Sequence, residues 1–105
     1  MPKLHEDHKT DAAGNPAGGE TKGLGIAITW QDGPLGRGAE RKEPNGAFLE
    51  DVVRAAIGRL QFFQASKFNC RDNSVALTHL ETALLWLNKR TADREERGVE
   101  GTHAK

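Results

Sequence analysis

The chain has little of what usually stabilises a small protein. It has one cysteine, Cys70, so no internal disulfide can form, and only 36% of its 105 residues are apolar. A chain of this length buries a modest fraction of its surface, so a core of its own would give marginal stability. Self-association is the simplest way to bury more apolar surface. The single thiol also suits a reducing compartment.

An excess of one charge and long apolar runs are missing as well. Lysine plus arginine number 15 and aspartate plus glutamate also number 15, so the net charge is zero. Without a bulk positive field, general binding to DNA or RNA polymers is not expected. No run approaches the roughly 18 apolar residues of a membrane span. The first residues lack the apolar segment of a secretory signal, which favours a cytoplasmic protein.

What is present predicts a mainly α fold with a small β part. Residues 1–22 contain almost no large apolar side chain and are predicted to form a disordered tail, because they cannot offset their ordering entropy. Residues 24–31 alternate in period two and predict a strand. The glycine- and proline-rich stretch that follows predicts a long loop, with a short second strand near residues 37–41.

The first of two predicted helices covers residues 46–66. Apolar residues recur there at three- and four-residue steps from Phe48 to Phe63, which makes one apolar stripe. Asn45 can cap this helix, and the acidic Glu50 and Asp51 lie near its positive end.

The second predicted helix covers residues 72–97, with Asp72 or Asn73 as its cap and Gly98 as its terminator. The short turn between the helices predicts an antiparallel hairpin. We expect one domain over residues 23–105, made of strand and loop (23–45), hairpin (46–98) and a C-terminal segment (99–105). Apolar residues in excess of one shared seam indicate a partner surface; they are Phe62, Leu85 and Trp86.

No motif in the chain argues for catalysis or for a bound metal. The glycine-rich stretches do not fit a dinucleotide or phosphate-loop fingerprint. Cys70 is a candidate nucleophile only if a base and an orienting group surround it, and packing in the turn is the favoured interpretation. Neither a cofactor nor a metal is expected, because no pair of histidines has ligand spacing on a predicted helix; the four are His5, His8, His79 and His103.

Arginines near the end of the second helix are more informative. Arg90 and Arg94 are four residues apart and share a helix face, so their guanidinium groups can bind phosphate oxygens in bidentate fashion. The alternative is a solvated face with ion pairs to nearby acids, and spacing alone favours it. Phe63 can stack on a base and Asn73 can contact a base or ribose, although spacing alone favours core packing and capping. The glycine-flanked Arg37 can lie close over a ligand.

Four strings in the chain are similar to those of a known family. They are Trp30-Gln31-Asp32-Gly33-Pro34, the stretch from Glu43 to Phe48, the stretch from Arg90 to Arg94, and the stretch from Gly98 to His103. In combination they resemble phage anti-Thoeris sponge proteins, which share a hairpin domain with anti-CBASS sponges. The likeness runs from about residue 24 to 103. The anti-Thoeris branch fits better, because strand and loop segments precede the hairpin.

The resemblance implies a protein without enzymatic activity, acting in the cytoplasm of the infected or lysogenic bacterium. Family members sequester immune signals, which are cyclic ADP-ribose isomers and, in some members, cyclic di- or trinucleotides. By the family pattern Phe63 stacks on the ligand base, Asn73 also contacts the ligand, and Arg90 and Arg94 bind its phosphates. A loop arginine contributes as well, which here is Arg37 or, alternatively, Arg41.

The spacing of these residues predicts a site shared between chains. Asn73 and Arg90 are 17 residues apart on one helix, or about 25 Å at 1.5 Å per residue. A cyclic ADP-ribose ligand is far shorter, so two antiparallel copies are needed to bring both residues to it. We therefore expect a homodimer or, as in some family members, a hexamer. A helical-hairpin module that binds a protein and no nucleotide remains the main alternative, followed by an enzyme that degrades the signal.

Overall fold

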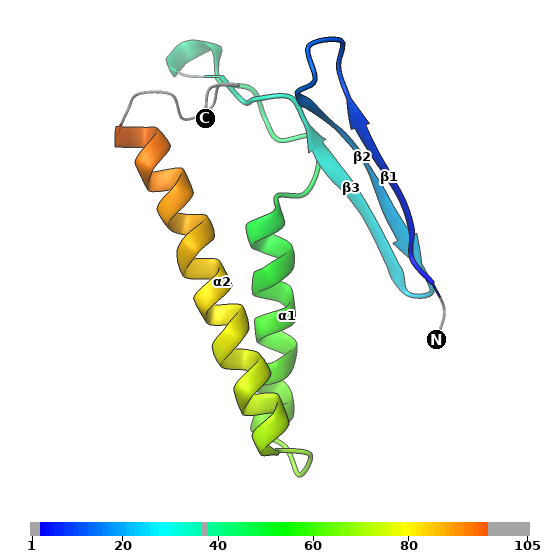
Figure 1. Cartoon of the computed structure of the whole chain (residues 1–105), viewed down its shortest axis with the longest axis vertical. Coiled ribbons are helices and arrows are strands. Elements are labelled where there is room, and N and C mark those ends of the chain that lie inside the picture. Colours follow the sequence, from blue (N-terminus) through cyan, green and yellow to red (C-terminus); the bar gives the residue numbers. More distant parts are fainter. Residues whose placement is uncertain (1–2, 37, 97–105) are drawn as a thin grey trace. The chain divides into compact units, whose positions relative to one another are not determined.

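The computed structural model describes residues 3–36 and 38–96, in two compact units that divide between Phe48 and Leu49 (Figure 1). The first unit holds strands β1 (His5–Thr10), β2 (Pro16–Gly23) and β3 (Ile26–Asp32) and the short 3-10 helix η1 (Gly38–Glu40). The second unit, Leu49–Arg94, holds helix α1 (Leu49–Gln64) and helix α2 (Arg71–Glu96) as far as Arg94. The two predicted helices are confirmed. The β part is larger than predicted, because it is a three-stranded sheet.

The prediction of a disordered tail over residues 1–22 is wrong for β1 and β2. Both strands are antiparallel to their neighbours, in the order β1-β2-β3. Gly19 has a φ of 120° and lies so close to β1 that an added Cβ would collide with the carbonyl oxygen of Asp7. Backbone pairing and close approach thus form these strands. Their side chains are mostly polar or small, so composition alone predicted disorder.

Strand β3 carries the apolar face of the sheet, as its alternation predicted. Gly19 lies opposite Trp30, and Thr21 lies opposite Ile28. The indole N–H of Trp30 donates a hydrogen bond of 2.9 Å to the Thr21 hydroxyl. Thr21 is only 4% exposed, the lowest value among the described residues whose burial is given. A part-buried hydrogen bond between two side chains therefore joins β3 to β2.

Asn45 does not cap α1, which is a correction to the prediction. Its side chain accepts a hydrogen bond from the backbone N–H of Asp32 (2.8 Å) and donates one to the backbone oxygen of Asp32 (3.1 Å). Its own N–H donates to the side chain of Gln31 (2.9 Å). Helix α1 begins only at Leu49, because Asn45 is held on the end of β3.

Residues after Asn45 continue along the outer edge of β3. Ala47 donates its N–H to the oxygen of Thr29 (2.7 Å) and accepts a bond from the N–H of Gln31 (3.0 Å), forming a parallel bridge. Gly46 lies against the backbone of Trp30, where an added Cβ would collide. Two of the strings behind the family resemblance therefore pack on each other. No strand forms at residues 38–41 of the described chain, where η1 lies instead.

The helical unit is an antiparallel hairpin (Figure 1), and the burial pattern of its helices has the spacing of a coiled coil. Half-buried residues of α2 alternate at steps of four and three: Asn73, Leu77, Leu80, Leu84, Leu87, Thr91 and Arg94. In α1 the same steps join Glu50, Val53, Ile57, Leu60 and Gln64, and Val52 and Phe63 are also half-buried. Such spacing keeps one stripe of each helix on its neighbour. Predicted site residues therefore lie at both polar ends of an apolar seam.

Cys70 caps α2, which begins at Arg71, contrary to the predicted cap at Asp72 or Asn73. The N–H of Asn73 donates to the Cys70 sulfur (3.4 Å), and the N–H of Ser74 donates to the Cys70 oxygen (3.2 Å). The side-chain amide of Gln64 binds both the N–H and the oxygen of Cys70, each at 3.1 Å. The predicted packing of Cys70 is also wrong, because the residue is exposed.

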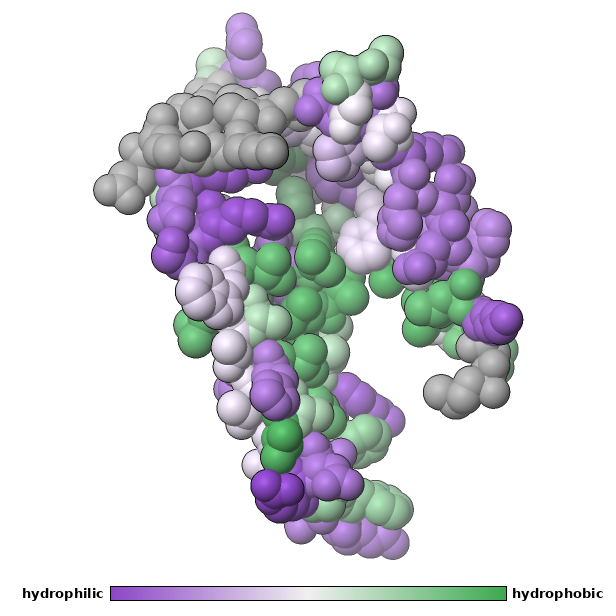
Figure 2. All heavy atoms as spheres, in the orientation of Figure 1, coloured by the Kyte–Doolittle hydropathy of each residue, from purple (hydrophilic) through white to green (hydrophobic). Residues whose placement is uncertain are grey.

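Large apolar side chains remain exposed on the hairpin, and Figure 2 shows hydrophobic residues, in green, over this unit. The surplus predicted from the sequence is confirmed, because Phe62, Leu85 and Trp86 are 59%, 69% and 66% exposed. Of the described residues with a given burial, only Ile57 and Thr21 are buried. Within the described chain, no helix is both long and apolar enough to cross a membrane.

Candidate functional site

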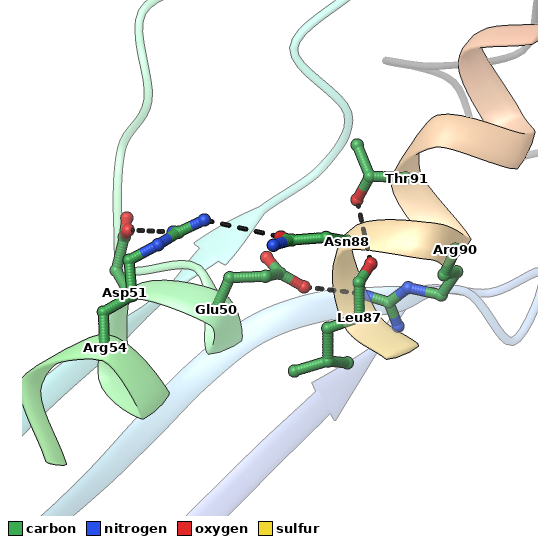
Figure 3. Close-up of polar contacts among 7 residues, drawn as sticks. All are labelled: Glu50, Asp51, Arg54, Leu87, Asn88, Arg90 and Thr91. Carbon is green, nitrogen blue, oxygen red and sulfur yellow. Dashed lines mark hydrogen bonds and ion pairs between the residues drawn. The ribbon is translucent and has the colours of Figure 1, made fainter. Parts of the chain in front are cut away.

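Arg90 is held by a carboxylate from the other helix. Its Nη2 donates to Oε1 of Glu50 at 2.8 Å, and Figure 3 shows this bond between the first turn of α1 and the end of α2. The Glu50 side chain is 14% exposed, whereas that of Arg90 is 58% exposed. The guanidinium is therefore anchored on one side and open to solvent on the other.

Arg94 lies one turn further along α2 and is half-buried in the seam stripe, so the two arginines have different surroundings. The alternative drawn from the sequence was a solvated face with ion pairs to nearby acids. Asp93 does form such a pair, but with Lys89, at 2.7 Å. Arg90 instead forms its ion pair with Glu50 of α1. This end of the hairpin thus offers two guanidinium groups, one exposed and one half-buried.

A second network keeps the two helices together beside Arg90. Arg54 binds the carboxylate of Asp51 at 2.8 Å and reaches the side-chain oxygen of Asn88 at 3.4 Å (Figure 3). Arg54 therefore spans from α1 to α2, as Glu50 does. The Thr91 hydroxyl donates to the Leu87 oxygen within α2 (3.4 Å). Of these three contacts, only the one between Arg54 and Asn88 joins α1 to α2, because the other two each lie within one helix.

The turn end of the hairpin carries an aromatic pair that holds an arginine. The rings of Phe62 and Phe63 lie 6.1 Å apart between centroids, tilted by 52°. The guanidinium of Arg59 lies 4.9 Å from the centre of the Phe63 ring and 5.0 Å from that of Phe62, within cation–π range. Sequence reasoning missed Arg59. Its spacing of three and four residues from the two phenylalanines was the available signal.

Asn73 belongs to the same end as Phe63. Its side chain donates to the Phe68 oxygen (3.3 Å), and the Phe68 N–H donates to the Ser66 hydroxyl (3.1 Å). That hydroxyl donates in turn to the Phe63 oxygen (2.6 Å). A chain of hydrogen bonds through the turn therefore links the two predicted residues. Phe63 and Asn73 are both half-buried, so part of each side chain remains accessible to a ligand.

The structure brings the predicted residues together as two pairs, and not as one site. Phe63 and Asn73 share the turn end, while Arg90 and Arg94 share the opposite end of the hairpin (Figure 1). Arg37 lies outside the described residues. Arg41 is exposed and belongs to the strand-bearing unit. Within one copy, an aromatic and amide surface is separated by the length of α2 from a guanidinium surface.

The family of this chain follows from comparison with known proteins. The profile described as "Acb2/Tad1, hairpin domain" matches residues 24–92, which is more than half of the chain. The chain belongs to the Acb2/Tad1 hairpin domain family. The matched segment includes Phe63, Asn73 and Arg90 but ends before Arg94. The resemblance to anti-Thoeris sponge proteins is confirmed by this match and by a phage relative.

That relative is "Thoeris anti-defense 1" of Bacillus phage SBSphiJ7. It is 64% identical to this chain over 61 residues, which cover 58% of the chain and 43% of the relative. The matched segment is therefore less than half of the relative's length. Identity this high over 61 residues indicates that the matched segments share a local fold.

Proposed function

We propose that this protein is a phage or prophage anti-defence protein that binds bacterial immune signalling nucleotides and sequesters them without degrading them. The name of the phage relative, "Thoeris anti-defense 1", supports an anti-Thoeris role for that relative. Membership of the hairpin family supports the same role for this chain. The observation that carries the proposal is the division of the hairpin into an aromatic and amide end and a guanidinium end. Cyclic ADP-ribose isomers are the proposed ligands, with cyclic di- or trinucleotides as a second class.

The chemistry of the two ends matches the two parts of such a ligand. An adenine ring can stack on Phe63, and the Asn73 amide can bind a base edge or a ribose hydroxyl. A diphosphate can accept charge-assisted hydrogen bonds from Arg90 and Arg94. A loop arginine, Arg37 or alternatively Arg41, adds a further cation. In this proposal, capture is reversible and the ligand leaves the site chemically unchanged.

Two copies of the chain form each site in this proposal. The turn end and the guanidinium end are about 25 Å apart along α2, too far for one ligand. In an antiparallel pair, the turn end of one chain faces the guanidinium end of the other, and a twofold axis generates two equivalent sites. Exposed Phe62, Leu85 and Trp86 can supply the apolar contact. A homodimer is the smallest such assembly, and a hexamer is the larger alternative.

Calorimetric titration with a panel of cyclic ADP-ribose isomers and cyclic oligonucleotides tests this function. We expect the double substitution Arg90→Ala and Arg94→Ala to weaken binding by at least about 100-fold, because each arginine contributes a charge-assisted interaction of about 1.5–3 kcal/mol. Lys89→Ala is the matched control, since it removes an exposed cation of the same helix that pairs with Asp93. The oligomeric mass should not change in either variant.

Two results would contradict the proposal. A wild-type protein that binds no member of the panel would leave the protein-binding hairpin as the better account. If the wild type does bind a ligand, heat denaturation of the complex distinguishes sequestration from catalysis. Under sequestration, the recovered ligand is chemically intact. An altered product would show an enzyme that degrades the signal. The protein is proposed to act in the cytoplasm of the infected or lysogenic host, where such signals are made.

A further inference from the structure

We propose that Glu50 is a positioning residue of the phosphate site, acting by holding Arg90; this inference rests on the proposed function. Glu50 lies in the first turn of α1, and its carboxylate is 2.8 Å from Nη2 of Arg90 on α2 (Figure 3). The bond crosses between the helices and joins residues 40 positions apart. It therefore fixes the direction of the Arg90 side chain relative to the hairpin.

The surroundings of Glu50 suit a fixed anchor. Its side chain is largely shielded from solvent, so solvent and salt screen its charge less than they screen that of an exposed carboxylate. The positive end of α1 also favours a negative charge in the first turn. A long arginine side chain loses rotamer entropy when it binds a ligand. By restraining Arg90 before the ligand arrives, Glu50 reduces that loss.

The geometry leaves Arg90 able to bind while it is held. Glu50 contacts Nη2 of the guanidinium, which has five N–H donors in all. More than half of the Arg90 side chain is exposed, so its other donors can reach phosphate oxygens. Glu50 therefore holds one nitrogen of the Arg90 guanidinium and leaves the other donors available to the ligand. Competition between this carboxylate and the ligand is the opposite hypothesis, and it predicts tighter binding when Glu50 is removed.

Neighbouring ion pairs differ from this one and supply a control. Asp51 is the next residue of α1, and it pairs with Arg54 of the same helix at 2.8 Å. Its side chain is 63% exposed, and it makes no described contact with Arg90. Asp51→Ala thus removes the same charge from the same helix turn without touching the proposed anchor. Any general effect of charge on α1 should appear equally in both variants.

Calorimetry with a cyclic ADP-ribose isomer that the wild type binds tests the inference, with inorganic pyrophosphate as a second probe. We expect Glu50→Ala to weaken binding of both about tenfold, equivalent to the loss of about 1.4 kcal/mol. Glu50→Gln keeps an acceptor for Arg90 and should weaken binding less. Asp51→Ala should stay within about twofold of the wild type. In an Arg90→Ala background, Glu50→Ala should cause no further loss, because its effect passes through Arg90.

Several outcomes overturn the inference. Equal or tighter binding by Glu50→Ala excludes positioning, and tighter binding would establish competition. The same tenfold loss in the Arg90→Ala background would show that Glu50 acts on the fold and not on Arg90. If Glu50→Ala does not fold by circular dichroism, Glu50→Gln decides: wild-type affinity for both probes together with an unchanged off-rate overturns the inference. A wild type that binds no nucleotide overturns the proposed function as well, whereas failure of the Glu50 variants alone leaves that function standing.

Discussion

At the scale of single residues, Thr21 is the least exposed of the described residues whose burial is given. Its hydroxyl accepts the only hydrogen bond described for the Trp30 indole, at 2.9 Å. We expect Thr21→Val to lower the stability of the sheet by about 1–2 kcal/mol, because the part-buried indole N–H loses its acceptor while the shape of the side chain is kept. Hydrogen exchange of the β2 and β3 amides measures this as faster exchange.

Thr21→Ser is the control for that change, since serine keeps the hydroxyl and removes a methyl group. Its exchange should be closer to the wild type than that of Thr21→Val. Equal protection in Thr21→Val and the wild type would show that the indole finds water instead, and that the bond adds nothing to stability.

At the scale of elements, the two units respond oppositely to the same substitution. Gly58 lies inside α1 with nothing within 4 Å of an added Cβ, so Gly58→Ala should stabilise the hairpin by about 0.5–1 kcal/mol through helix propensity. Gly19→Ala should instead disrupt the pairing of β1 with β2, because of its φ of 120° and the clash with Asp7. Thermal unfolding followed by far-ultraviolet circular dichroism measures both effects.

A thermal unfolding midpoint of Gly58→Ala below that of the wild type would contradict the stabilisation expected for an isolated hairpin. It would mean that a second chain packs closely against this part of α1, where a methyl group has no room. The direction of the change in Gly58→Ala therefore separates helix propensity from contacts between chains.

At the scale of the whole molecule, exposed large apolar side chains of the described helices mark a surface suited to self-association. Leu85 and Trp86 are the most exposed large apolar residues of α2. We expect Trp86→Ser to lower the oligomeric mass in light scattering. It should also remove the dependence of the unfolding midpoint on protein concentration, because association stabilises the folded state by mass action.

Ligand capture should fall together with the oligomer, since each proposed site takes residues from two chains. Glu81→Gln, at an exposed position of the same helix, should leave the mass and the midpoint as they are. A wild-type protein that stays monomeric at high concentration while binding a nucleotide tightly would refute the shared site.

The residues of the proposed site were found in part from the sequence. Spacing placed Arg90 and Arg94 on one helix, and the family resemblance drew attention to Phe63 and Asn73. The residues that hold them were not found. Glu50 lies 40 positions from Arg90, and nothing in local spacing joins them. Arg59 could have been found from its position relative to Phe62 and Phe63, because three- and four-residue steps share a helix face.

By itself, the sequence determined the two helices, the antiparallel turn between them and strand β3, because each carries a repeating apolar pattern that only one regular structure can bury. Only the tertiary structure decided that residues 5–10 and 16–23 are strands, that Asn45 binds the end of β3 and that Cys70 caps α2. The physical reason is shared. These features depend on backbone and side-chain hydrogen bonds whose partner is chosen by the folded chain, and such bonds leave no periodic pattern in the residues that make them.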